Sequence, residues 1–261
     1  RHPPRMRVGY RRCRQMTEIE VGDALDLLAE REDNSAECAI VDFPWEMDIK
    51  NGTGRFEYRG SAERAPSNGY RVTGHDGEMF DQIEDAAFPD VVEELTRVLR
   101  PGSWLLCFAD DRFQDPVRQT LRDVDGVTFR RNWAWSPHQM GMGYYGRVDH
   151  YPIPAATIGE TDRYVTGRGT LYRVKGGRQT EYPTGKPVDL YRRLLAPPVL
   201  QPGDTLLEPF CGHAPGAKVA HERGVDYWGA DTNPKAVEIA RERLEQQRIG
   251  QATLANGGKN G

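Results

Sequence analysis

The chain contains 261 residues, with a net charge of −4 and a hydrophobic content of 38%. This size suits one large domain with a single core and long polar loops, and the acidic balance argues against a general nucleic-acid coat protein. No apolar run approaches the roughly 20 residues that span a bilayer, and no signal-peptide-like apolar stretch follows the arginine-rich N-terminus. We therefore expect a cytoplasmic protein without a membrane segment.

Both ends of the chain are expected to be disordered, around a folded domain at residues 17–247. Residues 1–16 form a basic arm with six arginines, and such a run is usually solvated. Residues 248–261 are rich in glycine and asparagine, a composition that rarely folds. The four cysteines lie far apart and make no zinc-like pattern with histidine, which predicts reduced thiols and no metal site.

Short apolar runs alternate with amphipathic segments along the domain. In chain order, the pattern predicts strands at residues 19–21, 38–41, 104–108, 127–135, 153–158, 205–207 and 227–230. It predicts helices at residues 23–30, 88–99, 113–121, 186–195, 216–223 and 234–247. A long glycine-rich loop is expected at residues 46–82, and residues 159–185 show no clear period.

This alternation predicts an α/β fold that is doubly wound around a mainly parallel sheet. Ligands of such sheets bind beyond the carboxyl ends of the strands. Two unusual clusters occupy predicted strand ends, Asp42-Phe43-Pro44-Trp45 and Glu208-Pro209-Phe210-Cys211-Gly212. We therefore expect the two clusters to share one crevice.

The first cluster combines a carboxylate, a rigid proline and an aromatic plane. This combination suits a site that holds a flat ring while its exocyclic amine is modified. Most Asp-x-Pro segments are only turns, so the interpretation depends on the second cluster. There a strand leads into a tight turn and a helix, and the next predicted strand ends at Asp231. Nucleoside cofactors are held in this way, with an acid at the ribose hydroxyls.

The second cluster lacks the glycine pattern of a dinucleotide site. Pro215 also removes a backbone N–H that a pyrophosphate would use. A cofactor without phosphates therefore fits better. Asp231 taken alone is also compatible with an acid at the start of the helix that follows Asn233.

Together, these motifs resemble those of the S-adenosylmethionine-dependent amino DNA methyltransferases (N6-adenine or N4-cytosine), in the β arrangement of motifs. That family carries Asp-Pro-Pro-Tyr, or a near variant, before a cofactor motif Asp-Pro-Phe-x-Gly-x-Gly. Gly22-Asp23-Ala24 and Pro183-Thr184-Gly185-Lys186-Pro187 resemble two further family segments, in the family's order. The resemblance covers residues 17–247 and implies the Rossmann-like methyltransferase fold with a small target-recognition insert. The chain departs from the family at Phe43, Trp45 and Ala214.

The resemblance also implies roles for individual residues. The catalytic residues are expected to be Asp42, Phe43, Pro44 and Trp45. The cofactor-binding residues are expected to be Asp23, Asp42, Thr184, Lys186, Glu208, Phe210, Gly212 and Asp231. Asp42 and the carbonyl of Phe43 would accept the two N–H bonds of the target amine, and Trp45 would stack on a base that has left the duplex. No nucleophilic cysteine is needed, so Cys211 is interpreted as a loop residue.

Basic and aromatic residues are interleaved in the region 138–185, which we interpret as the target-recognition region. Contacts to double-stranded DNA are expected from Arg147, Arg168, Arg173, Lys175 and Arg178. Arg163 lies in the same stretch. A solvated, charged loop explains this composition equally well.

The sequence thus predicts a cytoplasmic, site-specific DNA methyltransferase of prokaryotic or viral origin. Adenine N6 is preferred over cytosine N4 because the catalytic tetrad begins with Asp42. One alternative is methylation of RNA or of a protein amide. The other is a degenerate, non-catalytic module that binds nucleic acid or cofactor, motivated by Phe43 and Ala214. A homodimer and a restriction partner are further expectations. The DNA sequence that the protein recognises is left open.

Overall fold

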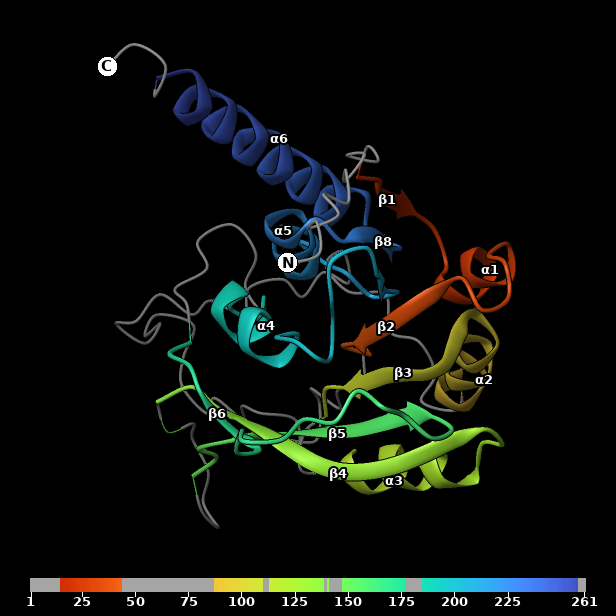
Figure 1. Ribbon diagram of the computed structural model, residues 1–261. Helices are drawn as coiled ribbons and strands as arrows, with labels where there is room; N and C mark the ends of the chain where they lie inside the picture. The colour runs from red at the N-terminus through yellow and green to blue at the C-terminus, as the bar shows by residue number, and fades with distance from the viewer. Residues whose placement is uncertain are drawn as a thin grey trace, which may run out of the picture.

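The structure is a computed structural model that describes residues 15–43, 87–109, 113–138, 140, 147–176 and 185–257, with side chains described as far as residue 246. The described strands form one sheet (Figure 1). They are β1 (Thr17–Val21), β2 (Ala36–Val41), β3 (Leu99–Cys107), β4 (Val127–Ser136), β5 (Tyr151–Ile158), β6 (Leu171–Arg173), β7 (Thr205–Glu208) and β8 (Asp226–Asp231).

The strand order across the sheet is β1-β8-β7-β2-β3-β5-β4-β6. β5 is antiparallel to both of its neighbours, β3 and β4. The other neighbouring pairs are parallel. The predicted doubly wound, mainly parallel sheet is therefore confirmed.

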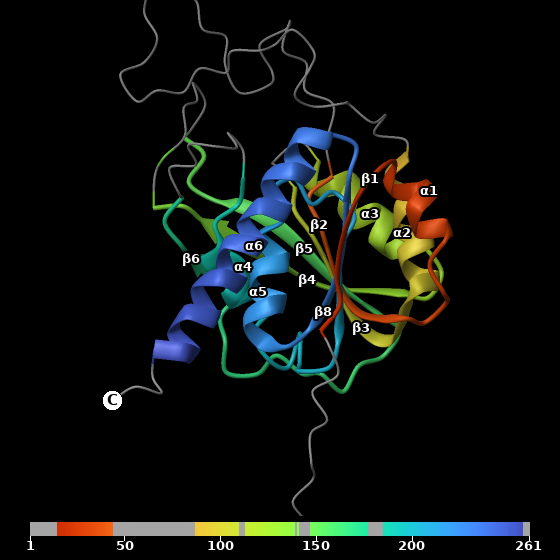
Figure 2. The same ribbon diagram turned by 90° about the horizontal axis from the view of Figure 1, so that it is seen from above.

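Helices cover both faces of this sheet (Figure 2). One face carries α1 (Ala24–Ala29), α2 (Phe88–Val98) and α3 (Gln114–Asp123), and the other carries α4 (Val188–Leu194), α5 (Pro215–Arg223) and α6 (Pro234–Gly257). Each layer buries its own apolar core against the sheet. β2 lies between the two cores, and every residue of Ala36–Val41 is buried, as expected for a central parallel strand.

Several predicted boundaries were wrong. β3 begins at Leu99, five residues before the predicted strand at 104–108, and runs through Pro101-Gly102. α6 continues to Gly257, so the predicted end of the helix at residue 247 and the disordered tail from 248 were placed too early. A single glycine inside a helix, here Gly250, costs only about 1 kcal/mol and does not stop it. At the other end, the Met16 N–H bonds Asp226 Oδ1 at 2.8 Å, so the fold begins before residue 17.

The predicted recognition region 138–185 was also drawn too widely. It contains β5, whose residues after Tyr151 are buried and which pairs with β3 and β4 inside the sheet. A recognition role can therefore fall only on the segments that flank this strand. The predicted arm up to residue 14 and the predicted loop at 46–82 lie outside the described residues.

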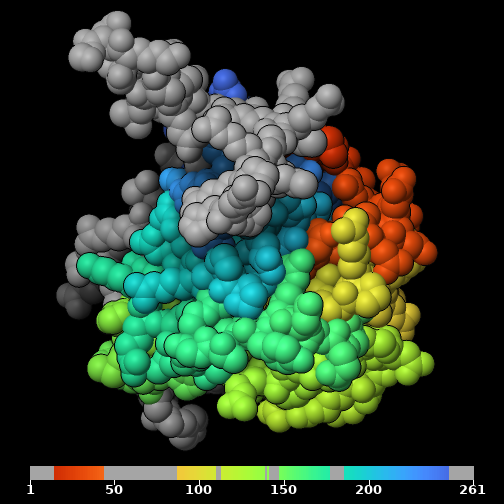
Figure 3. All heavy atoms as spheres, in the orientation of Figure 1, coloured from red at the N-terminus to blue at the C-terminus, as the bar shows by residue number. Residues whose placement is uncertain are grey.

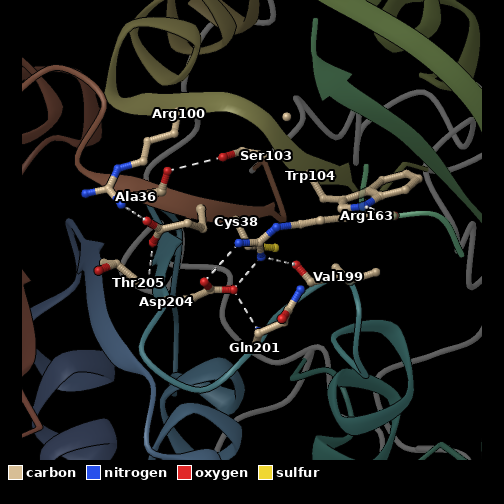
Figure 4. Close-up of polar contacts among 12 residues, drawn as sticks. Ala36, Cys38, Arg100, Ser103, Trp104, Arg163, Val199, Gln201, Asp204 and Thr205 are labelled. Atoms are coloured by element: carbon tan, nitrogen blue, oxygen red, sulfur yellow. Dashed lines mark hydrogen bonds and ion pairs between the residues drawn. The ribbon is translucent and has the colours of Figure 1, made fainter. Parts of the chain in front are cut away.

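Ion pairs and hydrogen bonds of charged side chains connect the segment after β5 with the amino ends of the central strands (Figure 4). Arg163 forms an ion pair with Asp204, whose carboxylate oxygen Oδ1 lies 3.0 Å from Arg163 Nη2. Glu37 pairs with Arg100 and accepts a hydrogen bond of 2.7 Å from the Thr205 N–H. Arg163 was grouped with the basic candidates in the sequence, but its side chain is directed inward and has this structural role.

Candidate active site

The two sequence clusters follow neighbouring strands at the carboxyl edge of the sheet. β2 and β7 are parallel and hydrogen-bonded to each other, and β8 and β1 continue the parallel order beyond β7. Asp42 follows β2, Glu208 ends β7 and Asp231 ends β8. The structure thus brings together residues that the sequence had placed at separate strand ends.

Phe43 and Phe210 join the two loops directly. Their ring centroids lie 5.2 Å apart with an interplanar angle of 73°, an edge-to-face contact. Phe43 also meets Phe88 of α2 edge to face, at 5.3 Å and 79°. Only 3% of Phe43 is exposed. The Phe43 ring therefore fills the space between the two loops.

Asp42 forms an ion pair with Lys186, which lies just before α4. The Asp42 side chain is 34% exposed and that of Lys186 19% exposed, so the pair is reachable from solvent. The Lys186 ammonium group also lies 5.1 Å from the centroid of the Phe108 ring, within the range of a cation–π interaction. These contacts hold the Asp42 carboxylate in one position, although such a partly exposed pair adds little stability.

The loop after β7 is a tight turn held by Asp231. The Asp231 carboxylate accepts hydrogen bonds from the N–H groups of Gly212, at 2.8 Å, and Asn233, at 2.9 Å. Gly212 and Ala214 both have left-handed backbone conformations, with φ values of 51° and 52°. That conformation costs a non-glycine residue roughly 1–2 kcal/mol. Ala214 therefore holds a backbone conformation that glycine usually adopts.

Asp23 caps the first helix at the same edge of the sheet. Its Oδ1 accepts hydrogen bonds from the N–H groups of Leu25, at 2.8 Å, and Asp26, at 3.3 Å. The preceding Gly22 N–H bonds the Asp231 carbonyl oxygen at 3.1 Å. Asp23 and Asp231 therefore follow neighbouring strands.

Glu208 points away from the loop surface and into the fold, where only 1% of it is exposed. Its Oε2 accepts hydrogen bonds from the Gly216 N–H, at 3.1 Å, and the Tyr227 hydroxyl, at 2.6 Å. Burial raises the pKa of Glu208 to about 8. The sequence had grouped Glu208 with the residues that contact a cofactor, whereas the structure places its carboxyl group below the loop.

The sequence reasoning missed two kinds of buried residue around this loop. Tyr191 and Tyr227 are 2% exposed and flank Glu208, although they come from α4 and β8. His213, inside the loop, is 3% exposed. Burial, together with the charges of Arg243 and Lys186, lowers the pKa of His213 to about 3. No local sequence signal marks these tyrosines, because their partners are distant in the chain.

Basic residues predicted to bind nucleic acid fall into two groups. Arg173 and Lys175 are exposed at the end of β6, and Arg147 is exposed before β5. Because β6 and β4 run parallel to each other and antiparallel to β5, all three lie toward the carboxyl edge. Arg168 instead donates hydrogen bonds to the carbonyl oxygens of Arg193 and Ala196, at 3.0 and 3.1 Å.

The segments that carry these residues belong to one face of the molecule. Figure 3 shows the green segment around β5 and β6 and the cyan segment around α4 adjoining on that face. α4 and β6 are in direct contact, and the Arg193 side chain reaches the Arg173 carbonyl oxygen at 3.1 Å. Pro44, Trp45, Thr184 and Arg178 lie outside the described residues, so their assignments stay predictions.

Two features are absent from the part of the chain that the structure describes. No helix among them is both long and apolar enough to cross a bilayer. Nor do they contain a group of three or more histidine, cysteine, aspartate or glutamate side chains arranged to hold a metal ion.

Comparison with known proteins identifies the fold through structure. No protein-family model matches the sequence, and no curated protein matches it. Solved structures that match along most of the chain include a DNA methyltransferase and a putative DNA modification methylase, and the chain shares their fold.

Three of these structures illustrate the match. The complex of M1.HpyAVI with SAM has a TM-score of 0.61 at 14% identity, covering 88% of this chain and 99% of that one. TTHA0409 from Thermus thermophilus, described as a putative DNA modification methylase and complexed with S-adenosyl-L-methionine, has a TM-score of 0.61 at 18% identity, covering 88% and 94%. The cytosine-N4-specific PvuII DNA methyltransferase has a TM-score of 0.63 at 11% identity, covering 87% and 85%.

Proposed function

We propose that this protein is an S-adenosylmethionine-dependent methyltransferase that modifies the exocyclic amine of a base in DNA. The observation that carries the proposal is the contact of Phe43 with Phe210. It places the loop of Asp42, which suits a planar amine, against the loop of Gly212, which suits a nucleoside. The fold shared with solved DNA methyltransferases supports the same interpretation.

The residues at the carboxyl edge fit this cofactor chemically. Asp231, at the end of β8, is an acid in the position that binds ribose hydroxyls in comparable sheets. Lys186, which pairs with Asp42, offers a cation that matches the carboxylate group of an amino acid. When bound, the cofactor supplies a methyl group on a sulfonium centre. In this proposal Asp23 and Phe210 border the site, Thr184 extends it, and Glu208 supports the loop from below.

Asp42 and Phe43 act on the acceptor in this proposal. The amine of adenine or cytosine is a weak nucleophile because its lone pair is delocalised into the ring. Asp42 and the Phe43 carbonyl accept its two N–H bonds, and the charged acceptor forms the stronger one. This localises the lone pair on nitrogen, so that the amine would take the methyl group in line as the bond of that group to sulfur breaks. The methylated amine would then release one proton to solvent. The acceleration then comes from positioning and preorganised polarity.

DNA is the proposed acceptor, with the target base extruded from the duplex and stacked on Trp45. The exposed Arg147, Arg173 and Lys175 lie toward the same edge as Asp42 and suit phosphate contacts. We favour adenine N6 because the tetrad begins with aspartate, with cytosine N4 as the alternative. A degenerate module is disfavoured because Phe43 packs between the loops and Ala214 keeps the left-handed turn.

One experiment tests the proposal. Purified protein is incubated with labelled S-adenosylmethionine and, separately, duplex DNA, RNA or protein, and the labelled products are hydrolysed and analysed. We expect label in N6-methyladenine from duplex DNA. Label in N4-methylcytosine would contradict the choice of adenine, and label only in RNA or protein would overturn DNA as the acceptor. Cofactor binding without transfer to any acceptor would instead support the degenerate module. The native source, a restriction partner and a homodimer stay predictions.

A further inference from the structure

Glu208 is connected to three elements around the cofactor loop. It ends β7, and its Oε2 lies 3.1 Å from the Gly216 nitrogen in the first turn of α5. The same oxygen lies 2.6 Å from the Tyr227 hydroxyl, on β8. The Tyr191 hydroxyl of α4 is a further hydrogen-bond partner. The loop that carries Phe210 and Gly212 therefore leaves and re-enters the fold at two points that one carboxyl group holds together.

Two glycines make room for this arrangement. A Cβ atom at position 216 would lie 2.5 Å from Glu208 Oε2, and one at position 229 would lie 2.4 Å from the Tyr227 hydroxyl. Both distances are far below van der Waals contact, so neither position accepts a side chain while Glu208 and Tyr227 keep their places. Glycine at position 216 follows from the position of the Glu208 carboxyl group, and glycine at position 229 follows from that of the Tyr227 side chain.

Burial, rather than the hydrogen bonds that Glu208 accepts, favours its uncharged form. Burial raises the pKa of Glu208 to about 8, while the hydrogen bonds from Tyr227, Tyr191 and Gly216 lower it and the charge of Asp42 raises it. Burial also raises the pKa of both tyrosines well above 10, so they remain neutral donors. Burial likewise raises the pKa of the Cys211 thiol, in the loop itself, well above its usual value.

We propose that Glu208 is the positioning residue of the cofactor loop and that it works as the neutral acid. Uncharged, it joins β7, α5 and β8 below the loop and leaves Asp42 as the nearby anion. Ionised, it would be a buried anion near the partly exposed carboxylate of Asp42. A buried charge without a cationic partner is strongly unfavourable. Loss of the proton therefore loosens the loop and sets an alkaline limit on cofactor binding.

The first test needs neither cofactor nor activity. A carboxyl group whose pKa rises from 4.5 to about 8 on folding holds a proton that the unfolded chain has released. Stability is then highest below that lower value and falls as the pH rises toward about 8. The midpoint of urea unfolding should fall over this range in the wild type. In Glu208→Gln, the part of this fall in the urea midpoint that is due to Glu208 should be absent. The control Glu93→Gln changes an exposed carboxyl group on α2 and should behave as the wild type.

The second test rests on the function proposed above. The dissociation constant for S-adenosylmethionine, measured by calorimetry, should rise about tenfold for each pH unit above the pKa of Glu208, as expected for one required proton. Glu208→Gln should bind as tightly as the wild type at pH 7 and lose this rise. If Glu208 had only a structural role, Glu208→Gln would not change the pH at which cofactor binding weakens. The control Glu93→Gln should not change that pH either.

A second variant keeps the inference testable if Glu208→Gln fails to fold. Tyr227→Phe removes a donor that stabilises the carboxylate, so it should move the fall in stability and the alkaline limit to higher pH. Equal pH profiles of stability for the wild type and a folded Glu208→Gln, or a shift to lower pH in Tyr227→Phe, would overturn the inference. If no variant binds S-adenosylmethionine but the stability profiles differ as expected, the proposed cofactor fails and the role of Glu208 in the loop stands.

Discussion

The rings of Phe43 and Phe210 meet edge to face with their centroids 5.2 Å apart, and they belong to loops that follow two neighbouring strands. Phe43 comes directly after Asp42, and Phe210 comes two residues before Gly212. The contact fixes the distance between the loop proposed to bind the acceptor and the loop proposed to bind the cofactor. The Phe43 ring is therefore part of the packing that joins the two loops.

Phe43→Ala should affect both stability and transfer. The ring is 3% exposed and packs on Phe88 and Phe210, and removing such a ring costs about 3–5 kcal/mol. Urea unfolding should show this loss, and methyl transfer should fall because the loops are no longer held together. The half-buried Phe129 of β4 provides the control: Phe129→Ala should leave transfer unchanged. Equal transfer by both variants would contradict the role of the Phe43 ring.

Asp231→Ala should weaken cofactor binding without weakening DNA binding. Asp231 holds the Gly212 and Asn233 N–H groups and is the proposed ribose ligand. Losing hydrogen bonds to a charged group costs about 1.5–3 kcal/mol, which corresponds to a roughly 10- to 100-fold rise in the dissociation constant. Calorimetric titration with S-adenosylmethionine measures this dissociation constant.

The matched control is Asp226→Ala, at the opposite end of the same strand, where the carboxylate bonds the Met16 N–H. It should leave cofactor affinity unchanged. If Asp231→Ala weakened DNA and cofactor binding equally while the fold stayed intact, the assignment of Asp231 to the ribose would be wrong.

Lys186→Met should lower both cofactor affinity and transfer, because it removes the cation that pairs with Asp42 and that is proposed to meet the cofactor carboxylate. Lys186→Arg should recover much of the affinity, since a guanidinium group also pairs with carboxylates. The exposed Lys218 of α5 is the control, and Lys218→Met should have no effect. Unchanged steady-state kinetics in Lys186→Met would remove this residue from the site.

Arg173→Ala and Lys175→Ala should each weaken DNA binding at all sequences and lower the slope of log affinity against log salt by about one. Arg168→Ala should differ from both, because its guanidinium group bonds carbonyl oxygens of Arg193 and Ala196. We expect it to lower the unfolding temperature and to leave the salt dependence unchanged. If the slope against log salt fell in Arg168→Ala but not in Arg173→Ala or Lys175→Ala, the assignment of these residues to DNA binding and to structure would be reversed.

The sequence predicted the fold class and the strand ends of the site because both depend on local patterns. Buried apolar runs mark β2 and β7, and polar residues directly after them mark the carboxyl edge. The adjacency of Asp42 and Lys186 is not visible in this way, since it depends on how α4 packs beside β2. The order of motifs in the similar family suggested that the segments of Asp42 and Lys186 belong to one site. The structure shows the ion pair between these two residues.

Side-chain direction explains most of what the sequence missed. Glu208 occupies a motif position, but its partners Gly216, Tyr191 and Tyr227 come from three elements, so its inward direction depends on tertiary packing. β5 was included in the recognition region because its place between β3 and β4 is decided by long-range pairing. Arg168 and Arg173 look alike in sequence and separate only through the carbonyl groups at the end of α4.

In the proposed reaction, Asp42 acts on the acceptor amine beside a bound methyl donor. The most direct measurement compares wild type and Asp42→Ala for transfer of labelled methyl groups to duplex DNA and for S-adenosylmethionine affinity in the same preparations. We predict that transfer falls by at least about 100-fold, as when a preorganised polar group is removed from an active site, while affinity changes by less than about tenfold. Transfer by Asp42→Ala at the wild-type rate, with the cofactor bound, would contradict the account.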